Sequence, residues 1–272
     1  MGEVISLISI KGGVGKTTLS SSLASDLVKS YGKRVLLIDA NYSAPNLGFH
    51  MNIIRPEKTI HDVLSGKARI ESAVYNRHGV DVVPGAANYR SPVNFLKLRD
   101  KVARVKDKYD FVIIDSSPSL NDEILSAMLA SDYLFVVTTP DYPTLSCSLR
   151  AAYHAKQRGK PIAGIIINRS RKPKYEIALG EIERAMGIPV VAHIPEDGGQ
   201  AKALHYRIPL TLLSGKGMAR EIKNLNSAIV GCNEPRSFIS YFFYKPKREE
   251  VNRQLLKESF YTRRFFSPYE RE

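Results

Sequence analysis

The chain has 272 residues, 43% of them apolar, and a formal net charge of +13. This apolar fraction is typical of a globular protein with a substantial core, and no stretch approaches the roughly 20 apolar residues of a membrane-spanning helix. Because the chain starts almost directly in a strand pattern, we expect no signal peptide. Two distant cysteines, Cys147 and Cys232, indicate thiols in a reducing cytoplasm. The charge excess suggests an anionic partner, either nucleic acid or anionic lipid, and a well-solvated basic surface is the alternative.

Short apolar runs alternate with longer helical patterns through residue 232. Most runs are apolar at successive positions, which is typical of strands buried on both faces of a parallel sheet. The predicted strands are 4–10, 35–39, 80–83, 111–115, 133–138, 162–167 and 190–194, and the predicted helices are 17–30, 92–107, 121–130, 143–158, 175–186 and 216–230. Repeated β–α units predict an α/β fold, a doubly wound, mostly parallel sheet with helices on both faces. Ligands of such sheets bind at the carboxyl ends of the strands.

A glycine-rich loop, residues 9–18, lies between the first predicted strand and the first predicted helix. There the glycines let backbone N–H groups turn around an anion, and the helix N-terminus adds a favourable dipole. Lys16 can reach the β- and γ-phosphates of a nucleotide, and the Thr17 hydroxyl can ligate Mg²⁺. A second lysine, Lys11, would repel Lys16 unless an anion neutralised both. The sequence therefore predicts a phosphate site of Gly12, Gly13, Val14, Gly15, Lys16, Thr17 and Thr18.

Two predicted strands close on aspartate. Asp39 ends the second strand, where a carboxylate beside the phosphate loop suits water-mediated Mg²⁺ coordination. Asp115 ends the apolar run 111–115 in a Walker B arrangement, close to where the γ-phosphate would lie. A terminal aspartate alone is a common strand cap, but the loop and both carboxylates occur in the order that a nucleotide site needs. We therefore predict a metal site of Thr17, Asp39 and Asp115.

The run Lys-Gly-Gly-x-Gly-Lys-Thr at residues 11–17 resembles the deviant Walker A loop of the MinD/ParA ATPases. Over about residues 3–230, this resemblance implies a P-loop ATPase that uses ATP and Mg²⁺. It also implies an ATP-dependent homodimer in which Lys11 reaches the partner's phosphates. In the family a second carboxylate on the Asp39 strand orients or activates the attacking water, and Asn41 stands there. An amide can position water but cannot accept a proton, so we expect slow hydrolysis or another catalytic group.

Further segments fit the same resemblance. Segment 43–48 resembles the switch segment next to this motif in MinD relatives, and segments 59–66 and 82–85 look more like MinD than like plasmid partition ATPases. Asn168 follows the apolar run 165–167 where the family has an amide that reads the adenine edge, although a turn-forming asparagine is the alternative. Beside the base the resemblance also predicts Pro195, Glu196 and Asp197.

Composition changes after Cys232, where the last 40 residues hold ten of the chain's 24 aromatic residues. The run 249–266 can form a helix with moderate amphipathicity. Its predicted apolar arc is Leu255, Leu256, Phe260 and Phe266, and its predicted basic face is Arg253, Lys257 and Arg264. This helix resembles the membrane-targeting helix that ends MinD proteins and suits an anionic membrane interface. Packing on the core or on a second subunit and contact with DNA are the alternatives.

The leading hypothesis divides the chain into an ATPase domain, residues 1–232, and a tail, residues 233–272. It makes the protein a MinD-like dimerisation switch that positions a division site, a chromosome or a polar organelle. We expect it in the cytoplasm or on the cytoplasmic face of the membrane, with an unidentified protein that stimulates hydrolysis. The alternatives are a ParA-type partition ATPase, whose DNA contact would use the basic loop 169–174, and a nucleotide-binding scaffold with little turnover.

Overall fold

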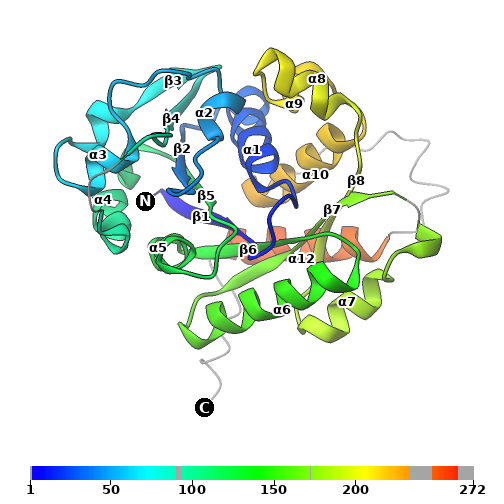
Figure 1. Cartoon of the computed structure of the whole chain (residues 1–272). Helices are drawn as coiled ribbons and strands as arrows, with labels where there is room; N and C mark the ends of the chain where they lie inside the picture. The colour runs from blue at the N-terminus through cyan, green and yellow to red at the C-terminus, as the bar shows by residue number, and fades with distance from the viewer. Residues whose placement is uncertain (1, 90–92, 172, 233–246, 263–272) are drawn as a thin grey trace.

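The computed structural model describes residues 2–89, 93–171, 173–232 and 247–262. Within these ranges the chain builds an eight-stranded sheet in the order β3-β4-β2-β5-β1-β6-β7-β8 (Figure 1). Neighbouring strands run parallel except β3 and β4, which pair antiparallel at one edge. The strands are β1 Glu3–Ile8, β2 Val35–Ala40, β3 Tyr75–Arg77, β4 Val80–Val83, β5 Phe111–Ser116, β6 Tyr133–Thr138, β7 Ile162–Ser170 and β8 Val190–Pro195. The predicted fold class is confirmed.

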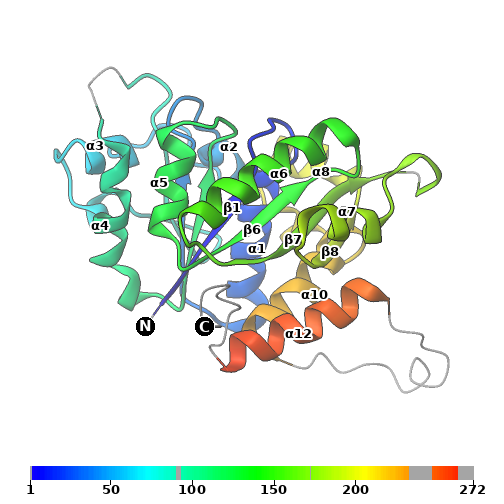
Figure 2. The ribbon, with the colours of Figure 1, turned by 90° about the horizontal axis from the view of Figure 1, so that it is seen from below.

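Helices cover both faces of this sheet. One face carries α1, α2, α9, α10 and α12, and the other carries α3 to α7 (Figures 1 and 2). The helices are α1 Lys16–Tyr31, α2 Leu47–His50, α3 Ile60–Leu64, α4 Leu98–Ala103, α5 Asp122–Ala130, α6 Tyr142–Gln157, α7 Leu179–Met186, α8 Gly199–Tyr206, α9 Leu210–Leu213, α10 Met218–Val230 and α12 Arg248–Thr262. Short 3-10 turns lie at Ile70–Ala73, Phe95–Lys97, Lys106–Lys108 and Pro173–Tyr175.

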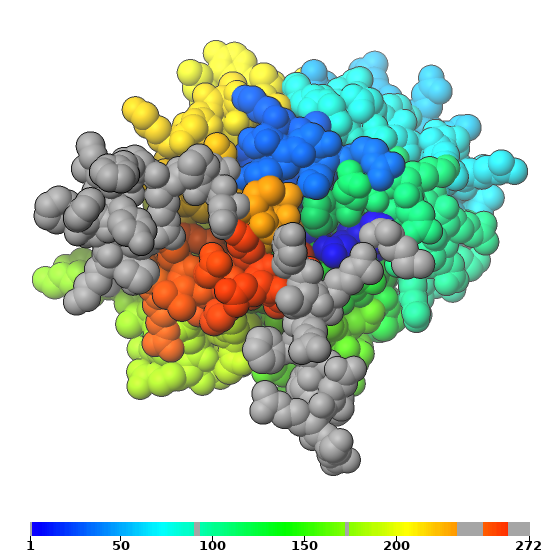
Figure 3. Space-filling view, turned by 180° about the vertical axis from the view of Figure 1, so that it is seen from behind, coloured from blue at the N-terminus to red at the C-terminus, as the bar shows by residue number. Residues whose placement is uncertain are grey.

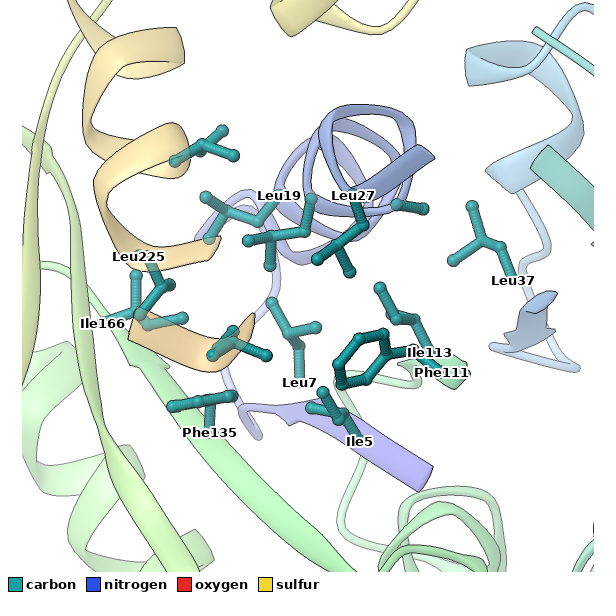
Figure 4. Close-up of a cluster of buried hydrophobic side chains, with 14 of the residues drawn as sticks. Ile5, Leu7, Leu19, Leu27, Leu37, Phe111, Ile113, Phe135, Ile166 and Leu225 are labelled. Carbon is teal, nitrogen blue, oxygen red and sulfur yellow. The ribbon is translucent and has the colours of Figure 1, made fainter. Parts of the chain in front are cut away.

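The central strand β1 is buried on both faces, as its continuous apolar run predicts. Leu7 faces α1 and packs near Leu19 and Leu27, with Phe111 of the neighbouring strand in the same cluster (Figure 4). Ile8 points to the opposite face and joins the core under α5 and α6. Burying a leucine or isoleucine side chain stabilises the fold by about 1.5–3 kcal/mol. This packing fixes the end of β1, and therefore the start of the glycine loop.

Several predicted boundaries were wrong. The first strand ends at Ile8 rather than at residue 10, because the next two residues already belong to the loop. The predicted helix 92–107 is only α4 between two 3-10 turns, with residues 90–92 outside the described ranges. The predicted helix 175–186 starts at Leu179. Ahead of it, Ile177 is buried and its N–H donates to the carbonyl of Pro140 at 3.0 Å, which ties that part of the chain to the start of α6.

The C-terminal helix α12 lies along α10 and β8, on the body of the protein (Figure 2). Leu256 and Phe260 are buried, with 4% and 7% of their surface exposed. The Phe260 ring meets Tyr133 of β6 edge-on, with 4.7 Å between ring centroids. One side of α12 stays at the surface (Figure 3). The buried apolar residues of this helix therefore contribute to the core that α1, α10 and the sheet form.

Two details of the predicted amphipathic helix were wrong. Leu255, assigned to the apolar arc, is 55% exposed. Arg253, assigned to the solvated basic face, is only 8% exposed, and its Nη1 donates to Oε2 of Glu221 on α10 at 2.9 Å. The reason is the spacing i, i+3, i+7, which places Arg253, Leu256 and Phe260 on one stripe of the helix. Residues 263–266 of the predicted helix lie outside the described ranges.

Among the helices of the described residues, none is both long enough and apolar enough to cross a membrane.

Candidate functional site

The glycine loop adopts a conformation that its glycines make accessible. Gly13 and Gly15 have φ of +81° and +92°, in the left-handed region, and Val14 between them is buried. Gly15 caps the N-terminus of α1, so the helix begins at Lys16. A Cβ on Gly15 would lie 2.4 Å from Nδ2 of Asn168, which leaves no room for a side chain. The position therefore needs glycine both for its φ and for its close contact with β7.

Two neighbouring side chains of β7 hold the loop from outside. The Nδ2 of Asn168 donates to the carbonyl of Val14 at 2.7 Å, and Nη1 of Arg169 donates to the carbonyl of Gly13 at 2.7 Å. Arg169 itself has a φ of +58°, which is uncommon for a residue with a side chain. The Oδ1 of Asn168 is buried and accepts no hydrogen bond from any described residue. Asn168 thus retains an acceptor beside the loop, while adenine recognition by this residue remains a prediction.

The two lysines of the loop have different environments. Lys16 is 7% exposed, and its Nζ donates to the carbonyl of Ser9 at 3.2 Å, across the loop. Burial lowers the pKa of Lys16 to about 8, although the negative charge of Asp115 opposes this shift. Lys11, at the front of the loop, is exposed. One lysine therefore serves its own loop, and the other is accessible from outside the molecule.

The two predicted metal carboxylates, Asp39 and Asp115, stand opposite each other on adjacent strands β2 and β5, and both are fully buried. Burial and the charge of Asp115 raise the pKa of Asp39 to about 8, although the backbone N–H groups that donate hydrogen bonds to Asp39 oppose this shift. Burial also raises the pKa of Asp115, which accepts hydroxyl hydrogen bonds from Thr17 at 2.6 Å and from Ser20 at 3.1 Å. The structure therefore places Thr17 against Asp115 and Asp39 opposite Asp115, while their binding of a metal ion remains a prediction.

This donor set fits Mg²⁺. Two buried carboxylates with raised pKa values lack a positive partner strong enough to keep both ionised, and a divalent cation would supply one. Within the described ranges, no three His, Cys, Asp or Glu side chains cluster as a metal site on their own. Mg²⁺ is commonly held by one or two carboxylates together with substrate phosphates and water, which agrees with Thr17, Asp39 and Asp115 beside a phosphate loop.

Asn41 lies just beyond the end of β2 with only 7% of its surface exposed. Its backbone N–H donates to Oδ1 of Asp39 at 3.1 Å, and its Nδ2 donates to the carbonyl of Ala44 at 2.6 Å. The amide is thus tied into the turn that follows β2. The same segment brings Oδ1 of Asn46 within 2.9 Å of the Thr17 hydroxyl, a contact that the sequence analysis missed.

A cavity of about 770 Å³ opens beside the loop between β7, β8, α2, α8 and α9. It joins predicted residues from distant parts of the chain, namely Thr18, Pro195, Glu196 and Asp197. One wall of the cavity is apolar and was not predicted, because α8 and α9 were not predicted; it is made by Leu204, Ile208, Pro209 and Leu210. The size of the cavity and its lining of both polar and apolar residues suit a nucleoside.

The polar residues at the rim of this cavity are already engaged. Arg171 forms an ion pair with Glu196, with Nε 2.5 Å from Oε2, and this guanidinium lowers the pKa of the Glu196 carboxyl. The carboxylate of Asp197 accepts the backbone N–H of Gly199 at 2.8 Å and that of Met218 at 3.1 Å. Asp197 therefore shapes the loop after β8, and its predicted contact with the base remains a prediction.

Comparisons with known proteins identify the family of this chain. A family model described as an AAA domain matches residues 2–149. An uncharacterised ATP-binding protein of Methanocaldococcus jannaschii is 32% identical over 253 residues, which cover 89% of this chain and 96% of that protein. The crystal structure of the cell division ATPase MinD of Pyrococcus furiosus superposes with a TM-score of 0.79 at 31% identity, covering 84% and 98% of the two chains. The chain belongs to the MinD/ParA family of P-loop ATPases.

A further relative carries a ligand. The septum site-determining protein MinD of Pyrococcus horikoshii, solved in complex with Mg-ADP, has a TM-score of 0.78 and 29% identity, and covers 90% of this chain and 100% of its own. The predicted family is confirmed, and the predicted ATP ligand agrees with membership of a family of ATPases.

Proposed function

We propose that the chain is an ATP-hydrolysing switch of the MinD type, which forms a homodimer when it binds ATP and Mg²⁺. The observation that carries this proposal is the contrast between Lys16, which is buried and reaches across its own loop, and Lys11, which is exposed. One lysine suffices for the phosphates of one subunit. An exposed second lysine at the front of the same loop fits a role toward the nucleotide of a second copy, where it would neutralise charge that develops during phosphoryl transfer.

The roles of the remaining residues follow from their positions. Backbone N–H groups of the loop and the Lys16 ammonium bind the phosphates. Thr17, Asp39 and Asp115 would hold Mg²⁺, which supplies positive charge to the phosphate oxygens when bound. Asn41 orients the attacking water by hydrogen bonds but cannot take its proton, so turnover is slow.

The proposed biological use is the positioning of a cellular structure on an anionic surface, which we take to be the membrane. Leu256 and Phe260 of α12 are buried, so in this arrangement they do not serve as lipid contacts. The sequence that follows, residues 263–272, begins Arg-Arg-Phe-Phe and is the candidate anchor. DNA binding through the loop 169–174 has less support, because Arg169 and Arg171 already bind Gly13 and Glu196.

Sedimentation with liposomes of anionic lipid tests the surface. We expect the full chain to pellet with ATP and to stay in solution with ADP, and removal of residues 263–272 to abolish pelleting while α12 stays docked. Removal from residue 233 would instead strip α12 from the core and is a poorer variant. Sequence-independent, salt-sensitive binding to DNA in place of lipid would contradict the membrane proposal and favour the ParA-type reading.

Sedimentation velocity tests the dimer. The wild type is expected to be dimeric with ATP and Mg²⁺ and monomeric with ADP. Lys11→Ala removes the exposed lysine without touching Lys16, so it should bind ATP yet remain monomeric. The matched control is Lys29→Ala, which removes an exposed lysine at the far end of α1 and should dimerise as the wild type does. A wild type that is monomeric with ATP at all concentrations would refute the proposal.

A further inference from the structure

A buried histidine lies beneath the segment that carries Asn41. His61 is on α3, and only 3% of its surface is exposed. Its Nε2 is 3.0 Å from the carbonyl oxygen of Tyr42, and its Nδ1 is 3.1 Å from the backbone nitrogen of Ala86. Because the Ala86 N–H can only donate, Nδ1 must accept and therefore carries no proton. Nε2 then bears the hydrogen that the Tyr42 carbonyl accepts, so both bonds need the neutral Nε2–H imidazole.

The two segments that His61 joins meet at the catalytic edge of the sheet. Tyr42 follows Asn41 directly, so its carbonyl belongs to the turn that positions the Asn41 amide. Ala86 follows Gly85, which packs against that same turn. A Cβ on Gly85 would lie 2.3 Å from Cβ of Pro45 and 3.4 Å from Oδ2 of Asp39. His61 therefore ties the Asn41 turn to the loop after β4 at the point where both meet Asp39.

Aromatic packing completes the attachment of this turn. The ring of Tyr42 stacks on Phe95 with 4.5 Å between centroids, and its hydroxyl is 3.2 Å from Oγ of Ser126 on α5. The His61 ring stacks on Tyr89 at 4.9 Å. The ring and hydroxyl of Tyr42 do not titrate at neutral pH, so the pH-sensitive attachment of this turn is its link through His61 to Ala86.

We propose that His61 is a positioning residue for ATP hydrolysis: its neutral imidazole links the Asn41 turn to the loop after β4, and its protonation breaks that link at Ala86. This inference rests on the proposed function, in which Asn41 orients the attacking water. A proton on Nδ1 would point at the N–H of Ala86, so that two donors would face each other. The hydrogen bond from Ala86 to His61 would then be lost, and with it the link between the two segments.

Burial and the charges around the ring set the pH at which His61 takes up a proton. Burial lowers the pKa of His61, while the hydrogen bond to the Tyr42 carbonyl and the charges of Asp62 on α3 and Glu123 on α5 act in the opposite direction. Lys67 lies 5.4 Å from the ring centroid of Tyr89, on the aromatic neighbour of His61. Because burial lowers the pKa of His61, the neutral imidazole prevails at neutral pH, and its protonation requires a lower pH.

Two substitutions separate the two bonds. In His61→Gln, the side-chain amide nitrogen of glutamine replaces Nε2 of histidine at the same number of bonds from Cβ. The hydrogen bond to the Tyr42 carbonyl can therefore form, while the bond to Ala86 is lost. In His61→Asn the amide oxygen takes the place of Nδ1, so the bond to Ala86 can form while Tyr42 is released. The matched control is His78→Asn. His78 is exposed and has a positive φ, which asparagine tolerates.

Steady-state hydrolysis by the full chain, from pH 5.5 to 8.5, gives the main test. At pH 7.5 we expect His61→Gln and His61→Asn each to lower kcat at least about tenfold with KM for ATP nearly unchanged, because each variant breaks one of the two bonds of the link. Below neutral pH, the kcat of the wild type and of His78→Asn should fall as the pH decreases, whereas the kcat of both His61 variants should not. Losses of kcat that only follow the thermal stability of each variant, or an acid loss of activity that persists in both variants, would mean a merely structural histidine and would overturn the proposal.

A second readout does not depend on activity. Hydrogen–deuterium exchange of the peptide 41–47, corrected for the intrinsic effect of pH, should rise in mild acid in the wild type and be high at every pH in His61→Asn. Absence of hydrolysis in the wild type would defeat the proposed function, whereas exchange would still decide the role of His61. Exchange in this peptide that ignores both pH and His61→Asn would refute the inference.

Discussion

The docking of α12 predicts a large cost for removing one aromatic ring near the end of the chain. Phe260 is 7% exposed and contacts Tyr133 of β6 edge-on, at 4.7 Å between centroids. Truncation of a buried phenylalanine to alanine commonly costs 3–5 kcal/mol. Because Phe260 lies near the end of its helix, where the surroundings can relax, we expect Phe260→Ala to lower the free energy of unfolding by about 3 kcal/mol.

Equilibrium denaturation of the full chain in urea, followed by circular dichroism, measures this loss. Leu255→Ala is the matched control, because Leu255 is a large apolar residue of the same helix but is 55% exposed. Its effect should stay below about 0.5 kcal/mol, as for most surface substitutions. Similar effects of the two substitutions, or a loss under about 1 kcal/mol for Phe260→Ala, would refute the docking of this helix and restore the amphipathic arc predicted from the sequence.

Three further predictions concern the nucleotide site. Gly15→Ala should weaken ATP binding more than tenfold in isothermal titration, because the added Cβ would lie 2.4 Å from Nδ2 of Asn168 on β7. Gly32→Ala is the control and should not weaken binding, since Gly32 also has a positive φ, +61°, but has open space around it. Equal losses of affinity in the two variants would contradict the steric argument. With the pKa of Lys16 lowered to about 8, the cationic form needed for phosphate binding is depleted as pH rises, so ATP affinity should fall by about tenfold between pH 7 and 9, and a flat profile would refute a titrating Lys16. Asn41→Asp should raise kcat several-fold by restoring a proton acceptor, and a wild type that turns over as fast as this variant would mean that another group takes the proton.

The sequence predicted the features that depend on local pattern. The glycine loop lies between a strand and a helix, and Asp39 and Asp115 stand one residue before the ends of β2 and β5, close to where spacing and strand burial placed them. Each of these signals is contained in a few consecutive residues, so a single sequence is enough to show it.

The missed features depend on contacts between distant segments. The helices α8 and α9, which wall the cavity, are short and carry no long apolar period. The inward turn of Arg253 is set by Glu221, 32 positions earlier in the chain. Likewise, no local pattern marks His61 as the link between Tyr42 and Ala86, because its partners are brought to it only by the folded sheet.

The specific activity of ATP hydrolysis as a function of protein concentration tests the central claim most directly. If Lys11 completes the site of a second subunit, turnover per chain must rise with concentration as dimers form, and then level off when all chains are paired. A mixture of the wild type with excess Lys11→Ala should depress that turnover. Turnover per chain that stays constant down to nanomolar concentration, in a protein that sediments as a monomer, would contradict the switch and assign hydrolysis to a single subunit.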